Sequence, residues 1–164
     1  MKKSEIALAA ILTVAAVGQI VLAIVLYNRE GSALVGNIGW AILWLSAVFG
    51  SWPILAFRSK GGVARGKSYI HTTVLVDSGP YAIVRHPQYL AGILISIALP
   101  LIARHWAVAL PGLVAVALHY VGAIQEEQSS IVKFGEDYRR YMETVPRMNF
   151  ILGIIRLVRR KRRG

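Results

Sequence analysis

The chain has 164 residues, of which 55% are hydrophobic and 16% are charged, and its mean hydropathy is +0.53. This length suits one domain, and so apolar a composition excludes an ordinary water-soluble globular protein. The absence of cysteine excludes disulfides and thiolate metal sites, and the formal net charge of +11 is concentrated in a few segments.

Two apolar runs open the chain, at residues 6–27 and 33–57. Each is long enough to cross the hydrocarbon layer of a bilayer, which requires about 20 residues of helix. A basic start before an apolar run also suits a signal peptide. The first run is longer than a signal-peptide core and further runs follow it, so we expect a retained helix. Small residues of the second run (Gly36, Gly39, Ala47 and Gly50) would let a neighbouring helix approach closely.

A basic, glycine-rich loop at residues 58–67 separates these runs from the rest of the chain. The apolar segment 68–76 is too short to span a bilayer, and we expect extended or irregular backbone there. Two further apolar runs, 89–103 and 107–124, are joined by a tight polar connection at residues 104–106. They predict a short or tilted helical hairpin.

The C-terminal region contains two shorter helical patterns. Phe134-Gly135 is expected to break the preceding helix, and residues 136–145 then place apolar and aromatic side chains at i, i+3, i+4 and i+7. Residues 150–158 are apolar but too short to span, and residues 159–163 are all basic. This combination predicts an interfacial helix that binds anionic lipid head groups, at about 1 kcal/mol per basic residue near the surface.

The distribution of basic residues predicts the orientation. With four spans, only Arg29 and Arg104 of the 19 Lys and Arg residues fall on the side opposite both termini. The positive-inside rule therefore places both termini in the cytoplasm, in the plasma membrane if the chain is prokaryotic. We predict an all-α, multi-pass integral membrane protein with four transmembrane helices. It forms a single membrane domain over residues 1–164, with two N-terminal spans in 1–57, a core in 58–147 and a basic tail in 148–164.

Chemically versatile side chains gather in the polar stretch DSGPYAIVRHPQYLAG at residues 77–92, which contains Tyr81, Arg85, His86 and Tyr89. Taken singly, each suits an interfacial anchor at a helix end. Pro87 restricts the backbone of His86, which makes that side chain a candidate for binding a ligand. Both interpretations stay open at this point.

A second polar stretch begins with the adjacent acids Glu126 and Glu127. Neighbouring helical residues point about 100° apart, so at most one of the two faces the bundle interior. Glu126 is the better candidate, because it lies four residues after Gly122 and seven after His119 on one helix face. Glu127 is expected to be a solvated helix end. An inward carboxylate needs a cationic partner, either an arginine or a ligand cation.

The stretches LVDSGPYAIVRHPQY (75–89) and EEQSSIVKFGEDYRRYMETVPR (126–147) together resemble the isoprenylcysteine carboxyl methyltransferase family. Phospholipid methyltransferases and sterol reductases are more distant relatives. The ordered pattern is S-G-x-Y, R-H-P-x-Y, E-E, F-G, Y-x2-Y and V-P-R, and it covers roughly residues 71–147. The resemblance implies a helical membrane enzyme with a cytoplasmic cofactor-binding C-terminal region, which moves a methyl group from S-adenosylmethionine to a lipophilic acceptor.

The resemblance also implies the residues that contact the cofactor, which are Thr73, Val74, Leu75, Val76, Tyr81, His86, Pro87, Gln88, Tyr89 and Glu126. Tyrosine faces attract the sulfonium and cover the base, and Glu126 pairs with the ammonium. Methyl transfer needs no metal, because it depends mainly on placing the nucleophile in line with the methyl group. No catalytic residue is assigned; the candidates are Arg85, Glu126 and Arg147.

The sequence departs from the family pattern in two places, and one of them leaves the acceptor open. The minor departure is that Gly92, the small residue after R-H-P-x-Y, comes one place later than expected. The family's substrate-directed arginine, four residues before the first paired glutamate, is Gly122 here. A lipid, a prenylated thiol, an isoprenoid acid and a small lipophile all fit an open membrane site. Two other functions stay in contention, an NADPH-dependent sterol-type reductase and a non-enzymatic membrane scaffold. Nucleic-acid binding is disfavoured, because no soluble basic fold accompanies the charge. The oligomeric state is open.

Overall fold

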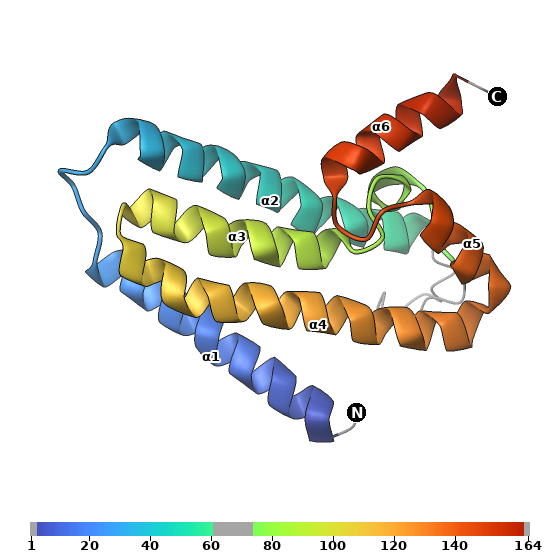
Figure 1. Cartoon of the computed structure of the whole chain (residues 1–164), viewed down its shortest axis with the longest axis horizontal. Coiled ribbons are helices and arrows are strands. Elements are labelled where there is room, and N and C mark those ends of the chain that lie inside the picture. Colours follow the sequence, from blue (N-terminus) through green and yellow to red (C-terminus); the bar gives the residue numbers. More distant parts are fainter. Residues whose placement is uncertain (1–2, 61–73, 163–164) are drawn as a thin grey trace. The chain divides into compact units, whose positions relative to one another are not determined.

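A computed structural model describes residues 3–60 and 74–162, with side chains for 6–56 and 74–162. These residues form helices and connecting turns and contain no strand (Figure 1). In chain order the elements are α1 (Lys3–Val25), α2 (Ala33–Lys60), η2 (Gly79–Ala82), α3 (Pro87–Ala103), η3 (Trp106–Val108), α4 (Ala109–Phe134), α5 (Glu136–Thr144) and α6 (Phe150–Lys161). The all-α prediction is confirmed for the described residues.

The chain divides into two compact units. The first unit comprises Met1–Ala47 and Leu90–Gly122, and the second comprises Val48–Tyr89 and Ala123–Gly164. Helices α2, α3 and α4 each contribute residues to both units.

Among the described residues, three helical segments are long and apolar enough to cross a membrane, namely Ile6–Val25, Ala33–Ala56 and Trp106–Phe134. Helix α3 is apolar but shorter, so the fourth predicted span stays a prediction. Pro53 lies inside α2, which continues to Lys60. The proline therefore removes one helical hydrogen bond without ending the helix.

Buried polar side chains join the helices of the first unit. The side chain of Gln19 on α1 donates from Nε2 to the carbonyl of Ser96 at 2.8 Å and to that of Val108 at 3.2 Å. The Ser46 hydroxyl on α2 donates to the carbonyl of Ala91 at 3.0 Å. Such bonds between helices satisfy polar groups that would be costly to leave unpaired in apolar surroundings.

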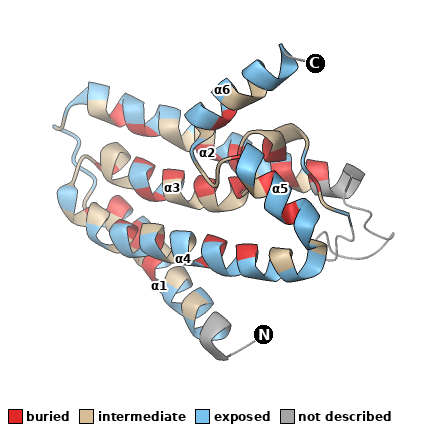
Figure 2. Ribbon diagram, turned by 45° about the vertical axis from the view of Figure 1, so that its right-hand side comes forward, coloured by how far each residue is buried: buried red, intermediate tan, exposed pale blue. Residues whose placement is uncertain are grey.

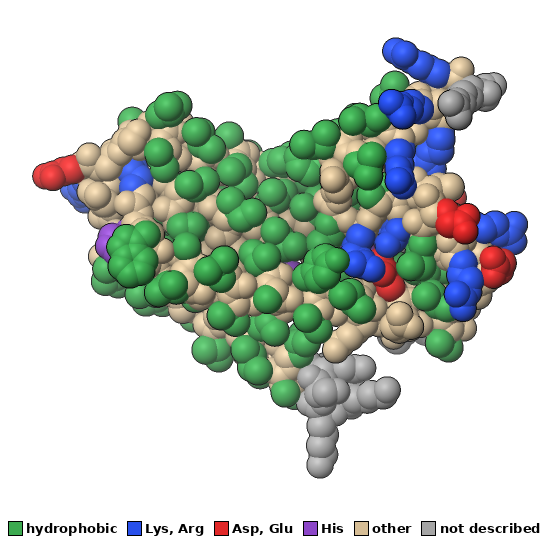
Figure 3. Space-filling model, in the orientation of Figure 1, with side chains coloured by type: hydrophobic (Ala, Val, Ile, Leu, Met, Phe, Trp, Pro, Cys, Tyr) green, Lys and Arg blue, Asp and Glu red, His purple; other side chains and the backbone are tan. Residues whose placement is uncertain are grey.

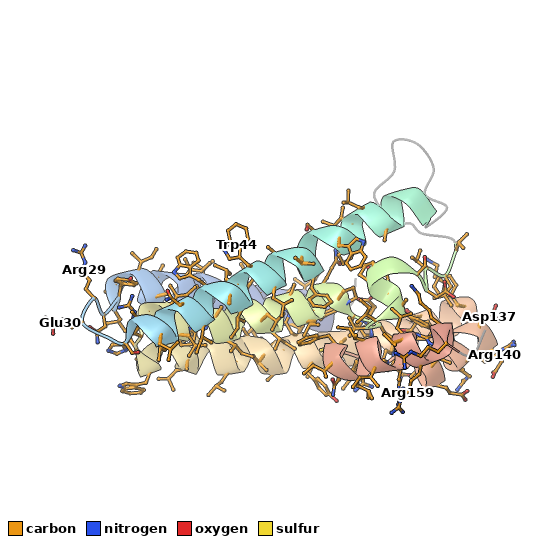
Figure 4. All side chains as sticks on the ribbon, turned by 90° about the horizontal axis from the view of Figure 1, so that it is seen from above. Arg29, Glu30, Trp44, Asp137, Arg140 and Arg159 are labelled. Atoms are coloured by element: carbon orange, nitrogen blue, oxygen red, sulfur yellow. The ribbon has the colours of Figure 1, made fainter. Side chains whose placement is uncertain are left out.

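Small residues allow close packing within the same unit. A Cβ atom added at Gly39 of α2 would lie 2.8 Å from the backbone nitrogen of Ile102 on α3, and one added at Gly92 would collide with the His119 ring. The predicted close approach of a neighbouring helix at Gly39 is therefore confirmed, and that helix, α3, belongs to the same chain. Apolar side chains such as Trp44, which is 72% exposed, instead project outward from their helices (Figure 4).

The second unit contains the predicted break after α4. Helix α4 ends at Phe134, and Gly135 has a φ of +57°, which favours glycine. Helix α5 starts at the next residue, and its predicted apolar face is buried around Tyr138, Tyr141 and Val145, with exposed residues on its other side (Figure 2). The predicted amphipathic helix is thus confirmed to within one residue at its end.

Candidate functional site

Glu127 lies at the centre of the site, and the prediction that it is a solvated helix end is wrong. Its side chain is 3% exposed, whereas that of Glu126 is 53% exposed. Helix α4 continues beyond both acids to Phe134, so neither of them ends a helix. The side of α4 that carries Glu127 is covered by two arginines, which compensate its buried charge.

The first of these arginines is Arg85. Its Nη2 and Nε atoms donate to Oε1 of Glu127 at 2.6 and 3.1 Å, and its Nη1 atom donates to the carbonyls of Met142 and Val145 at 2.8 and 2.6 Å. Four of the five guanidinium N–H groups are thereby engaged. Arg85 therefore ties the segment after η2 to α4 and to the end of α5.

The second arginine, Arg147, binds both oxygens of the same carboxylate. Its Nη2 atom lies 2.7 Å from Oε2 of Glu127, and its Nε atom lies 3.0 Å from Oε1. The backbone N–H groups of Arg85 and His86 also donate to the carbonyls of Pro146 and Arg147, at 3.0 and 3.1 Å. The R-H-P and V-P-R motifs therefore lie side by side, with the second of the paired glutamates between their arginines.

The His86 side chain is buried beside the ion pairs that Glu127 forms with Arg85 and Arg147. Its Nε2 atom lies 3.3 Å from Oε1 of Glu127, without a well-aligned hydrogen bond, and its ring packs edge-on against Tyr89 with centroids 5.6 Å apart. Burial lowers the pKa of His86 to about 4; the Glu127 carboxylate opposes this shift and Arg85 adds to it. His86 is therefore neutral at physiological pH.

A cavity of about 410 Å³ lies in the second unit, a volume typical of small-ligand sites. It is bounded by the segment before η2, by η2 itself, by one face of α4 and by α5. Its lining residues are Val74, Leu75, Val76, Tyr81, Arg85, Gln88, Glu126, Ser129, Ser130, Lys133, Phe134, Tyr138 and Tyr141.

The structure brings together several of the residues that the sequence assigned to a cofactor. Those that line the cavity are Val74, Leu75, Val76, Tyr81, Gln88 and Glu126, whereas His86, Pro87 and Tyr89 do not line it. Thr73 lies outside the described residues. Among the catalytic candidates, Arg85 and Glu126 line the cavity and Arg147 does not.

Tyr89 and Pro87 act on the cavity indirectly. The Tyr89 hydroxyl forms a hydrogen bond with the Glu126 carboxylate, which orients a lining side chain. Pro87 is the first residue of α3 and therefore fixes where that helix begins beside Gln88.

The sequence did not predict Ser129, Ser130 and Lys133, which line the cavity from α4 together with Glu126. Ser129, Ser130 and Lys133 follow Glu126 at i+3, i+4 and i+7, so all four share one helix face. This is the spacing that predicted the buried face of α5, and applied to Glu126 it would have found these residues.

Helix α5 lines the cavity with Tyr138 and Tyr141, and the hydroxyls of both tyrosines form hydrogen bonds. The Tyr141 hydroxyl donates to the carbonyl of Tyr81 at 2.7 Å, and the Tyr138 hydroxyl bonds to the Ser130 side chain. Burial raises the pKa of Tyr138 to about 12 and raises that of Tyr141 further above its ordinary value. Both hydroxyls are therefore protonated at physiological pH, and Tyr141 keeps the proton that it donates to Tyr81.

The cavity lining combines both signs of charge with aromatic faces. Glu126 supplies a carboxylate, and Lys133 supplies an ammonium that lies 5.1 Å from the ring centroid of Phe134. Such a lining suits a ligand that carries both charges and a flat group. Within the described part of the chain, no group of three or more His, Asp or Glu residues is placed to hold a metal ion.

Comparison with protein families matches residues 67–133 to the isoprenylcysteine carboxyl methyltransferase (ICMT) family. The matched residues contain the R-H-P-x-Y motif, the paired glutamates and much of the cavity lining, but end before α5 and the V-P-R motif. Searches of curated proteins and of solved structures found no match. The family match, together with three described helices able to cross a membrane, indicates an integral membrane protein whose residues 67–133 are similar to the isoprenylcysteine carboxyl methyltransferase family.

Proposed function

We propose that the protein transfers a methyl group from S-adenosylmethionine to a lipophilic acceptor. One observation carries the proposal. Residues 74–76, Tyr81 and Gln88 all lie within the stretch 74–88, whereas Glu126 is far from them in the sequence, yet all of them line one cavity. These are segments to which the family resemblance assigns the cofactor.

The lining residues fit the chemical groups of that cofactor. Glu126 suits the ammonium, and Lys133 and the neighbouring serines suit the carboxylate. The faces of Tyr81 and Phe134 suit the sulfonium and the flat base. The cavity volume of about 410 Å³ is large enough for a ligand of this size class.

When bound, S-adenosylmethionine supplies a methyl group activated by its sulfonium cation. The chain's own residues bind and orient, because an in-line displacement depends chiefly on the positions of the reacting atoms. Glu126, oriented by Tyr89, holds one end of the ligand, and the Tyr141–Tyr81 hydrogen bond fixes the wall formed by η2 and α5. Arg85 maintains this wall through its bonds to Glu127 and to the end of α5.

The acceptor determines whether a base is needed. A carboxylate acceptor attacks without losing a proton, whereas an amine or thiol must lose one. Gly122, which replaces the family's arginine, is buried within α4 and offers no cation to a carboxylate. We therefore propose an acceptor recognised mainly through its apolar part.

We also propose four membrane spans, with both termini in the cytoplasm. The support is the charge distribution, in which only Arg29 and Arg104 lie on the opposite side. Because the chain has no cysteine, single cysteines introduced at Glu30 and Asp137 provide unique labels. A membrane-impermeant maleimide added to intact cells should label the first and spare the second, and the reverse pattern would overturn this orientation.

Calorimetry on detergent-purified protein tests the cofactor assignment. S-adenosylmethionine and S-adenosylhomocysteine should both bind, and Glu126→Gln should weaken S-adenosylmethionine about tenfold or more by removing a charge-assisted bond. The matched control is Glu136→Gln, an exposed carboxylate on α5 that does not line the cavity. Absence of binding by the unaltered protein would refute the proposal, and tighter binding of NADPH would favour a reductase.

Radiolabelled methyl transfer to a membrane lipid extract then identifies the acceptor class.

A further inference from the structure

Helix α6 has one face held against the second unit. A Cβ atom at Gly153 would collide with the carbonyl of Ile83, and the Phe150 ring lies 5.8 Å from the Phe49 ring. Arg160 donates from Nη2 to the carbonyl of Ala82 at 3.0 Å. These contacts fix which side of α6 points away from the protein.

The outward side carries an apolar stripe, which we call the α6 stripe. It consists of Ile151, Ile154, Ile155 and Val158, at i, i+3, i+4 and i+7, and their exposed fractions are 62%, 45%, 43% and 43%. At about 100° per residue, the stripe lies roughly opposite Gly153. Four large aliphatic side chains in one row form a contiguous apolar surface that needs a partner.

Basic side chains flank the α6 stripe, and residues 150–164 contain no acid. Lys and Arg side chains gather over α6 in Figure 3, and Arg159 projects away from the helix in Figure 4. Arg159 and Lys161 are exposed, and neither forms a hydrogen bond or ion pair with another residue that the structure describes. Their charges therefore face outward without an acidic counterpart in that part of the chain.

We propose that α6 docks on an anionic phospholipid surface, with the α6 stripe inserted at the head-group boundary and the flanking cations against lipid phosphates. An amphipathic helix with large aliphatic residues on one face and cations beside them is typical of interfacial binding. A second copy of the chain fits less well, because a two-fold contact would place like charges together. A bilayer, by contrast, is always present beside an integral membrane protein. The proposal does not depend on the methyltransferase assignment.

A single fluorescent label tests this docking in the full chain. Because the natural sequence has no cysteine, Ile155→Cys carries a unique environment-sensitive nitrobenzoxadiazole label in the α6 stripe. The protein is placed one copy per nanodisc, in phosphatidylcholine alone or mixed with phosphatidylglycerol. We expect a blue-shifted emission in the mixed discs, reversed by high salt, because salt screens exposed charges. A label at Asp137→Cys on α5 should give the same emission in both discs.

Charge variants separate lipid docking from other causes. Arg159→Gln with Lys161→Gln should weaken the lipid-dependent shift about fivefold for each charge removed. The matched control is Arg139→Gln with Arg140→Gln, which removes two exposed charges from α5. Val158→Cys provides a second label position in case Ile155→Cys perturbs the helix.

The proposal is overturned if the emission is the same in both kinds of disc, or if the α5 variant loses as much of the shift as the α6 variant. A shift that appears only in detergent as the protein concentration rises, and never in single-copy discs, would assign the α6 stripe to a second copy of the chain and would also overturn it.

Discussion

Nη2 of Arg85 and Oε1 of Glu127 lie 2.6 Å apart, and both side chains are almost fully buried, at 7% and 3% exposed. Arg147 completes the arrangement from the other side of the same carboxylate. Removing one member of a buried pair leaves an uncompensated charge, which destabilises far more than losing an exposed pair. This geometry makes the Glu127 carboxylate important for the stability of the second unit.

Glu127→Gln should therefore lower the free energy of unfolding by about 3–5 kcal/mol. Glu126→Gln is the matched control, because this neighbouring carboxylate is 53% exposed, and it should cost about 1 kcal/mol or less. SDS-induced unfolding of the detergent-solubilised protein, followed by circular dichroism, measures both. Similar losses for the two variants would contradict the assignment of the structural role to Glu127.

His86 should make stability depend on pH. Its pKa is about 4 in the folded chain and about 6.5 when unfolded, so between these values the unfolded chain binds the proton and the folded chain does not. The contribution of His86 to the free energy of unfolding is fully present above about pH 6.5. It falls, by roughly 3 kcal/mol at most, as the pH drops to about 4.

His86→Gln should flatten this part of the stability profile relative to the natural protein, because the variant has no imidazole to protonate. His105→Asn removes a half-exposed histidine from the first unit and is the matched control. Unfolding titrations at several pH values compare the slopes. An unchanged slope in His86→Gln would show that burial of this imidazole does not govern the acid sensitivity.

Tyr141→Phe should remove one buried hydrogen bond, from the Tyr141 hydroxyl to the carbonyl of Tyr81 at 2.7 Å. We expect a loss of about 1 kcal/mol in unfolding free energy and a severalfold weaker binding of S-adenosylmethionine, because Tyr81 lines the cavity. Tyr27→Phe, which removes an exposed hydrogen bond to Arg104, should leave that binding unchanged. Equal cofactor affinity in Tyr141→Phe and in the natural protein would disprove the link between this bond and the cavity.

Gly153→Ala should displace α6 from the segment that carries Tyr81, because the added methyl group collides with the carbonyl of Ile83. We expect a loss of about 1–3 kcal/mol and faster cleavage of the basic C-terminal helix by trypsin. Gly18→Ala in α1 is the control. Nothing lies within 4 Å of its added Cβ atom, so alanine should be neutral or stabilising there. Unchanged trypsin sensitivity in Gly153→Ala would argue against this contact.

Patterns within single segments of the chain are enough to predict most of the local structure of the protein. Long apolar runs predict α1, α2 and α4. Glycine adopts a positive φ readily, so Gly135 can end α4 with a φ of +57°. The spacing of Tyr138 and Tyr141 predicted the buried face of α5. Each of these features depends on the period of one element or on the preference of one residue, which neighbours in the chain suffice to specify.

Which of the paired glutamates faces inward depends on contacts between segments that are distant in the sequence. The 100° step along α4 shows that Glu126 and Glu127 diverge, but not which side the R-H-P and V-P-R segments cover. Packing of those distant segments placed Arg85 and Arg147 on the Glu127 side and left Glu126 to the cavity. Because a buried carboxylate is stable only with its cations in place, partners far away in the sequence, and not the helix itself, determined the roles of the two acids.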